Sequence, residues 1–98
     1  HDSKGVVSDW IRAVREYDED HLVYRFHETW NQKGPMAMIQ NFVAPFIQQV
    51  GFCWQTGTIN VSHEHFATEL LSNFLSKKFQ TFFLMLNLLT TMFYQQRI

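Results

Sequence analysis

Residues 54–71, WQTGTINVSHEHFATELL, decide how this chain is expected to fold. Gly57 marks a turn, because glycine adopts backbone conformations that other residues avoid. Ser62 is a favourable helix cap, and Glu64 would lie in the following first turn, where the helix dipole favours negative charge. The stretch therefore predicts one helix that ends near Trp54, a short turn, and a second helix that begins at Ser62.

Four apolar stripes recur at helical spacing along the whole chain. They are separated by Asp18, which is expected to cap the second helix, by Gly34-Pro35, and by Gly57. The stripes predict helices over residues 9–17, 19–33, 35–56 and 62–78. Because no segment alternates as a strand would, the predicted class is all-α: an up-down four-helix bundle with an extended apolar C-terminal helix.

Finer signals lie inside these helices. Ser8 is expected to cap the first helix, with residues 2–7 weakly ordered before it. Pro45 lacks a backbone N–H, which predicts a kink in the third helix near residues 41–43. Gly51 lies in the same helix at a cost of about 1 kcal/mol relative to alanine. Either a close helix contact or a ligand resting near the backbone would explain that glycine.

Composition narrows the possible functions. Ninety-eight residues make one domain, and the net charge of −1 provides no basic face for phosphate contacts, so this segment is not expected to touch nucleic acid. Cys53 is the single cysteine, which excludes an internal disulfide and is typical of a reducing, cytoplasmic setting. We expect Cys53 to be a small buried residue rather than a reactive thiol.

The C-terminal stretch 79–94, FQTFFLMLNLLTTMFY, is apolar on every side of a helix. Its longest unbroken apolar run is residues 82–86, whereas a membrane span needs about 18–20 apolar residues, so no span is predicted. A helix apolar all round has to be buried all round, which favours a symmetric homodimer. The helix would either break near Ser76-Lys77-Lys78, where C-terminal helices could be exchanged, or project and pair with another chain. The apolar patch would comprise Phe79, Phe82, Phe83, Leu84, Met85, Leu86, Leu88, Leu89, Met92 and Phe93.

The histidines do not suggest a zinc site. Zinc-binding helices place two histidines four residues apart on one face, whereas His63 and His65 are two apart and diverge by about 200°. His21 and His27 are six apart and also diverge. The sequence has no glycine-rich phosphate loop, no cysteine pair and no Ser-His-Asp arrangement, so no enzymatic activity is predicted.

Trp54 and the pair Glu64-His65 are the candidate site residues. The predicted helix–turn–helix brings the indole and the acid–imidazole pair to the same end of the domain, as a ligand cap would require. Taken singly, Trp54 is also explained as a core residue, Glu64 as a first-turn acid and His65 as a surface residue. The residues alone leave both interpretations open.

The spacing of Trp54, nine intervening residues and then Glu64-His65 resembles the Trp-x9-Glu-His signature of the CarH/LitR-type photoreceptors. These are MerR-type transcriptional regulators that sense light with adenosylcobalamin. The flanking residues 42–71 resemble the third and fourth helices of the family's four-helix bundle, including its proline and the glycine before the tryptophan. By helix pattern the resemblance extends over residues 9–78.

The resemblance implies a helical cap over the upper axial face of adenosylcobalamin. Trp54 would lie against the adenosyl group, Glu64 would hydrogen-bond it, and Val61 would line the same pocket. After light breaks the cobalt–carbon bond, His65 would ligate cobalt from above. Light would thereby control an oligomer and DNA binding by a separate winged helix.

The chain also departs from that family pattern. Residues 1–98 are expected to form a single helical domain, with the DNA-binding domain and the α/β cobalamin-binding domain absent from this chain. The α/β domain would be the missing partner, so adenosylcobalamin is expected to bind tightly in the full-length context and not to these residues alone. Two alternatives remain open: a stand-alone, self-associating helical module with no cofactor, and the cap of a corrinoid carrier or methyltransferase.

Overall fold

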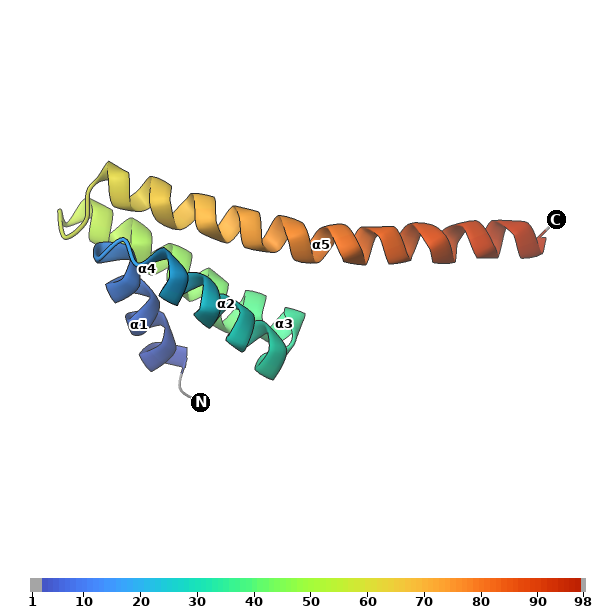
Figure 1. The fold of residues 1–98 in the computed structure, drawn as a ribbon, viewed down its shortest axis with the longest axis horizontal. Helices are drawn as coiled ribbons and strands as arrows, with labels where there is room; N and C mark the ends of the chain where they lie inside the picture. Colours follow the sequence, from blue (N-terminus) through green and yellow to red (C-terminus); the bar gives the residue numbers. More distant parts are fainter. Residues whose placement is uncertain (1–2, 98) are drawn as a thin grey trace.

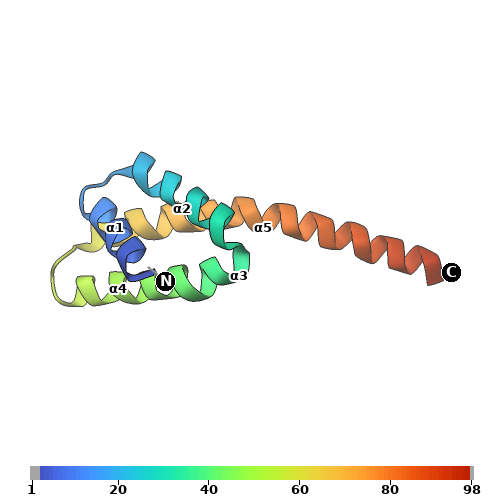
Figure 2. The ribbon, with the colours of Figure 1, turned by 90° about the horizontal axis from the view of Figure 1, so that it is seen from below.

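The computed structural model describes residues 3–97, and beyond residue 81 it describes the side chains of residues 84, 87, 88 and 91 only. Consecutive helices run in opposite directions, and α5 lies along the others before extending beyond them (Figures 1 and 2). The elements are α1 (Ser3–Arg15), α2 (Glu19–Lys33), α3 (Pro35–Met38), the π-helical turn η1 (Ile39–Val43), α4 (Ala44–Gln55) and α5 (Val61–Arg97). Because α3, η1 and α4 follow one another without a gap, they form one long helix. The predicted all-α fold of four packed helices is confirmed, and residues 3–97 contain no strand.

The first helix begins earlier than predicted. α1 starts at Ser3 rather than at Asp9, so Ser8 lies inside the helix and does not cap it, and residues 3–7 are helical. Val7 is only 7% exposed and continues the buried stripe of Trp10 and Val14 by one turn. Burial of Val7 therefore extends the helix past the local capping signal.

The boundaries of α2 agree with the prediction. The Asp18 side chain accepts a hydrogen bond from the backbone N–H of His21 at 3.3 Å, as an N-cap does. Gly34 ends the helix with a φ of 85°, and its own N–H donates to the carbonyl of Trp30 at 3.0 Å. Pro35 then opens α3, where the missing N–H costs nothing.

The predicted irregularity before Pro45 takes the form of a π-helical turn. The backbone N–H of Ala44 donates to the carbonyl of Ile39, five residues earlier, across η1. Pro45 has no N–H to donate to residue 41, so the chain inserts one extra residue into the turn and then resumes an α-helix. Phe42 and Val43 remain buried at 5% exposure each, so the turn keeps the apolar face directed at the core.

Asn60, not Ser62, caps α5. Its side-chain Oδ1 accepts from the backbone N–H of His63 at 3.2 Å, and its own backbone N–H donates to His63 Nδ1 at 3.1 Å. This is the reciprocal arrangement of a capping box, with histidine in place of the usual glutamate. The helix consequently starts at Val61, one residue before the predicted position.

α5 does not break at Ser76-Lys77-Lys78. It continues to Arg97, as its sequence without glycine or proline allows, and the projecting alternative is the one observed (Figure 1). Among the side chains described beyond residue 81, Leu84 and Leu88 are 58% and 66% exposed. No described helix is long and apolar enough to cross a membrane. The rest of the predicted apolar patch lies outside the described side chains, namely Phe82, Phe83, Met85, Leu86, Leu89, Met92 and Phe93.

An aromatic core holds the helices together. Trp10 of α1 meets Phe26 of α2 and Phe46 of α4 edge-on, with ring centroids 4.9 and 5.3 Å apart. Phe74 of α5 contacts Phe26 at 5.5 Å, and Trp30 reaches Phe79 at 6.0 Å. These contacts anchor the first half of α5 against the other helices, so the start of α5 is held in place beside the end of α4.

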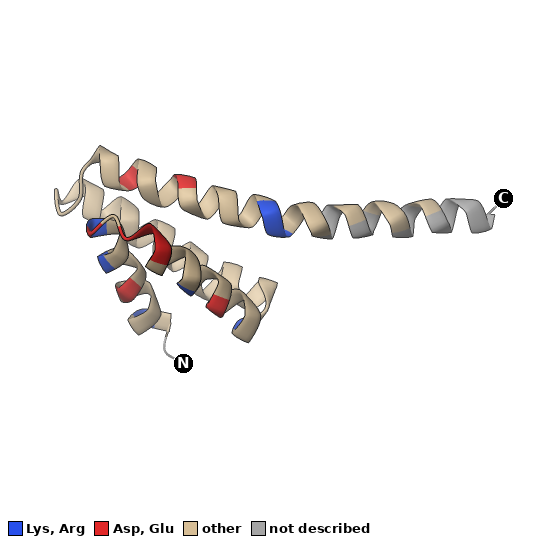
Figure 3. Ribbon diagram, viewed as in Figure 1, with Lys and Arg blue, Asp and Glu red and all other residues tan. Residues whose placement is uncertain are grey.

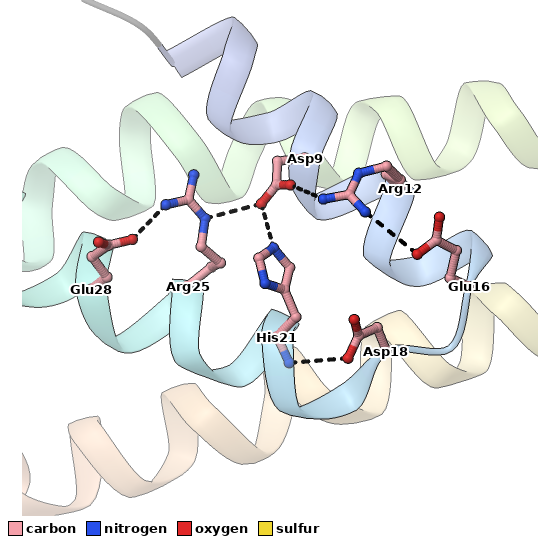
Figure 4. A network of polar contacts seen from close by, with 7 residues as sticks. All are labelled: Asp9, Arg12, Glu16, Asp18, His21, Arg25 and Glu28. Carbon is pink, nitrogen blue, oxygen red and sulfur yellow. Dashed lines mark hydrogen bonds and ion pairs between the residues drawn. The ribbon is translucent and has the colours of Figure 1, made fainter.

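A polar network joins α1 to α2 (Figure 4). Asp9 accepts hydrogen bonds from Arg12 on its own helix and from Arg25, and it lies 2.8 Å from His21 Nε2. Burial by itself would raise the pKa of Asp9, but the hydrogen bonds from His21, Arg12 and Arg25 together hold that pKa below its ordinary value. Asp9 is therefore a charged tie between the first two helices.

Candidate functional site

The predicted site residues lie together in a cavity of about 430 Å³ between α4 and α5. This volume lies within the range of small-molecule sites. The contributions of α4 are Phe46, Ile47, Val50, Gly51 and Trp54, and those of α5 are Val61, Glu64, His65, Ala67, Thr68 and Leu71. All four predicted residues thus line one cavity, whereas none of them lines the wider groove of about 870 Å³ between α1 and α4.

Trp54 is a surface residue at this cavity and not part of the core. It is 54% exposed, and Val61 across the turn is 52% exposed. The preceding residue, Cys53, turns inward and is buried at 6% exposure, as predicted for a small apolar residue. Of the two interpretations of Trp54, the core interpretation is therefore wrong, and a large indole is left available at the mouth of an apolar cavity.

The carboxylate of Glu64 is held by two neighbours on α5. Thr68 Oγ1, one turn later, donates to Glu64 Oε2 at 3.0 Å. His65 Nδ1 lies 2.9 Å from Glu64 Oε1. The two contacts fix the carboxylate beside the cavity while its side chain stays 34% exposed, so the remaining lone pairs are available to a donor on a ligand.

His65 presents a free ring nitrogen to the outside. A carboxylate oxygen 2.9 Å from Nδ1 favours the proton on Nδ1, because two facing lone pairs would repel each other. In the neutral ring the lone pair then lies on Nε2, which has no partner among the described residues. With its side chain 76% exposed, His65 can accept a hydrogen bond or ligate a metal through Nε2.

His63 has a different role that the sequence did not indicate. Its ring stacks on Tyr17 with centroids 4.5 Å apart, and its Nε2 lies 3.2 Å from the carbonyl oxygen of Arg15 at the end of α1. Since Nδ1 accepts from Asn60, the proton lies on Nε2 and is donated to that carbonyl. His63 therefore fastens the start of α5 to α1, and this in turn positions the neighbouring Glu64 and His65.

The described residues contain no group of three or more histidine, cysteine, aspartate or glutamate side chains arranged to hold a metal ion. Any metal at His65 would have to receive its other ligands from elsewhere.

Seven of the cavity residues were not predicted as site residues, and Thr68 and Gly51 are the two of them that bear on what the cavity can bind. Thr68 could have been found from its spacing, because a threonine four residues after Glu64 lies on the same helix face. For Gly51 the sequence offered two explanations, a close helix contact or a ligand near the backbone, and its place in the cavity depends on how α4 and α5 pack.

Comparison with known proteins gives one result that covers most of the chain. The model of a family described as a B12 binding domain matches residues 6–77. Neither a curated protein nor a solved structure matches. The matched range runs from α1 to the middle of α5 and contains the whole α4–α5 cavity.

Proposed function

The chain belongs to the family of B12 binding domains, and from this membership we propose that it is the helical cap of a cobalamin-dependent, light-sensing transcriptional regulator. The family's helical domain caps a Rossmann-like domain that binds B12. The observation that supports the specific proposal is the α4–α5 cavity, which is lined by an exposed indole, a carboxylate and an imidazole with a free nitrogen.

The residues present fit the upper side of adenosylcobalamin, which supplies a cobalt–carbon bond that light can break. Trp54 offers a planar apolar face to the adenosyl group, and Val61 extends that surface. Glu64, held by Thr68, accepts hydrogen bonds from hydroxyl groups. His65 offers Nε2 as an upper ligand for cobalt. The cap's part in the proposal is to bind, orient and shield the upper group, and it does not include catalysis.

The regulatory role rests on the resemblance of Trp54, Glu64 and His65 to the Trp-x9-Glu-His signature. In the proposed full-length context, an α/β domain holds the lower face of adenosylcobalamin and a separate MerR-type domain binds DNA in the cytoplasm. Figure 3 shows both basic and acidic residues along the ribbons of α1 and α2, with the acidic run Asp18-Glu19-Asp20 at the start of α2, so neither helix carries basic residues alone. DNA contact is therefore assigned to the other domain.

The projecting half of α5 favours a second candidate, a helical module that self-associates without a cofactor. Leu84 and Leu88 are exposed there, beyond the range that the family model matches. This candidate predicts dimers whose formation is indifferent to cobalamin, whereas the cap proposal predicts a response of the α4–α5 cavity to the corrinoid. A methyltransferase cap would share the bundle but would not need Trp54 together with Glu64-His65.

The test is a titration of the chain with adenosylcobalamin in the dark, followed through the indole N–H signal of Trp54 in nuclear magnetic resonance spectra. Without a domain to hold the lower face, we expect weak binding with a Kd of about 1 mM, equivalent to about −4 kcal/mol. The Trp54 signal should move while those of the buried Trp10 and half-buried Trp30 stay in place. Trp54→Ala should lose the binding; because this variant has no indole at position 54, its titration is followed through the backbone amide signals of Gly51 and Glu64 in the same cavity. A Trp54 signal that does not respond at any corrinoid concentration would contradict the proposal.

A further inference from the structure

Gly51 has no explanation within the chain itself. It lies inside α4, where glycine is less favourable than alanine. The glycines with positive φ are Gly34 and Gly57, so the backbone at Gly51 does not require glycine. Apart from its two chain neighbours and the backbone of its own helix, a Cβ built on Gly51 would have no heavy atom within 4 Å, so no neighbouring helix requires glycine either.

The surroundings of Gly51 form a notch in the cavity wall. Ile47 and Trp54 lie one turn before and one turn after it on the same face of α4, and they are 57% and 54% exposed. Seven residues of helix separate these two side chains by about 10 Å along the axis. Between them the wall is bare backbone, and across the cavity Glu64 and Thr68 face it from α5.

We propose that Gly51 determines how well the cap accepts a large upper axial group: its bare backbone admits a group the size of adenosyl, and a side chain there would weaken the binding of that group. This inference rests on the proposed function. An adenosyl group that stacks on Trp54 would occupy the space beside it on α4, which is the space over Gly51. A methyl group on cobalt is too small to extend across the notch.

The proposal predicts effects of opposite sign on stability and on binding. Gly51→Ala adds a helix-favouring residue in open space, so the Tm should rise by about 2–8 °C. The same methyl group would overlap the adenosyl group, and the Kd for adenosylcobalamin should rise about tenfold, the typical result of overpacking a fitted site. The Kd for methylcobalamin should change by less than about twofold, because that ligand does not reach the notch.

The experiment compares three chains in the dark: the unchanged chain, Gly51→Ala, and the matched control Gln48→Ala, which alters an exposed α4 residue outside this cavity. Each is titrated with adenosylcobalamin and with methylcobalamin through the Trp54 indole signal, and each is melted without ligand. Selective loss of adenosylcobalamin binding in Gly51→Ala, together with a raised Tm and an unaffected Gln48→Ala chain, is the expected result.

The remaining outcomes separate the two claims. If the unchanged chain binds adenosylcobalamin and Gly51→Ala binds it equally well, the role of Gly51 is wrong and the proposed function stands. Equal weakening for both corrinoids, or a lowered Tm, would also overturn the role of Gly51, since either would indicate general damage. If the unchanged chain binds neither corrinoid, the proposed function falls and the role of Gly51 falls with it.

Discussion

At the scale of single residues, the helix geometry of His63-Glu64-His65 gives the two histidines different roles. His63 faces α1, where it stacks on Tyr17 and donates to the carbonyl of Arg15. His65, two residues on, faces outward with a free Nε2. The divergence of about 200° that argues against a shared zinc ion is what allows one histidine to hold the fold and the other to meet a ligand.

This division predicts different effects of the two substitutions. His63→Ala should lower the free energy of unfolding by about 1–2 kcal/mol, because it removes the cap partner of Asn60 and the tie to α1. His65→Ala, at a side chain 76% exposed, should change it by less than about 0.5 kcal/mol. Urea unfolding followed by circular dichroism measures both. Equal losses for the two variants would show that the roles are assigned wrongly.

Asp9 predicts how the stability depends on acid. Because its pKa in the folded chain is lower than the unfolded value of about 3.9, its contribution is present above that value and is lost as the pH falls through the folded pKa. Asp9→Asn should therefore cost about 1–2 kcal/mol at pH 7, since three charged or polar partners lose a carboxylate. Urea unfolding at pH 7, 5 and 3 should show this difference shrinking below about pH 4. A difference that is the same at pH 3 and pH 7 would contradict the role of Asp9.

At the scale of elements, α5 has two halves with different surroundings. Its first half carries the cavity residues and packs through Phe74 against the aromatic core. The contact of Phe79 with Trp30 lies near the end of this packed part, and the helix then projects (Figure 2). Leu84 and Leu88 on the projecting half are exposed, and we propose that another molecule covers them.

Removal of residues 81–98 tests whether that second half serves assembly rather than folding. The full chain should form a dimer at micromolar concentration, and the shortened chain should be a monomer by light scattering. The free energy of unfolding per folded chain should change by less than about 1 kcal/mol, because the aromatic contacts between helices among the described side chains involve no residue beyond Phe79. A full-length species with the monomer mass of 11.7 kDa would contradict the dimer.

At the scale of the whole molecule, the features that could be predicted are those with local causes. Asp18 caps α2 with its side chain, and Gly34 and Pro35 set the end of α2 and the start of α3 through their backbone properties. Pro45 produces an irregular turn where expected. The common location of Trp54 and Glu64-His65 followed from one short turn.

Features with distant causes could not be predicted from the sequence. The early start of α1 depends on a core that buries Val7, and the role of His63 depends on a carbonyl 48 residues away. Trp54 is exposed because the adjacent residue Cys53, and not Trp54 itself, faces the core. The sequence also could not decide whether α5 breaks near Lys77-Lys78 or continues through it, because lysines neither end nor require a helix.

In the proposed function, the α4–α5 cavity caps the upper side of adenosylcobalamin, and His65 becomes the upper ligand of cobalt after illumination. The most direct measurement is the visible absorption spectrum of the chain with adenosylcobalamin before and after illumination. We predict that illumination produces the spectrum of cobalamin with an imidazole ligand for the unchanged chain and for His27→Gln, which alters an exposed histidine away from the cavity. His65→Ala should instead give the spectrum of cobalamin illuminated without protein. An illuminated spectrum that is the same with and without His65 would contradict the account.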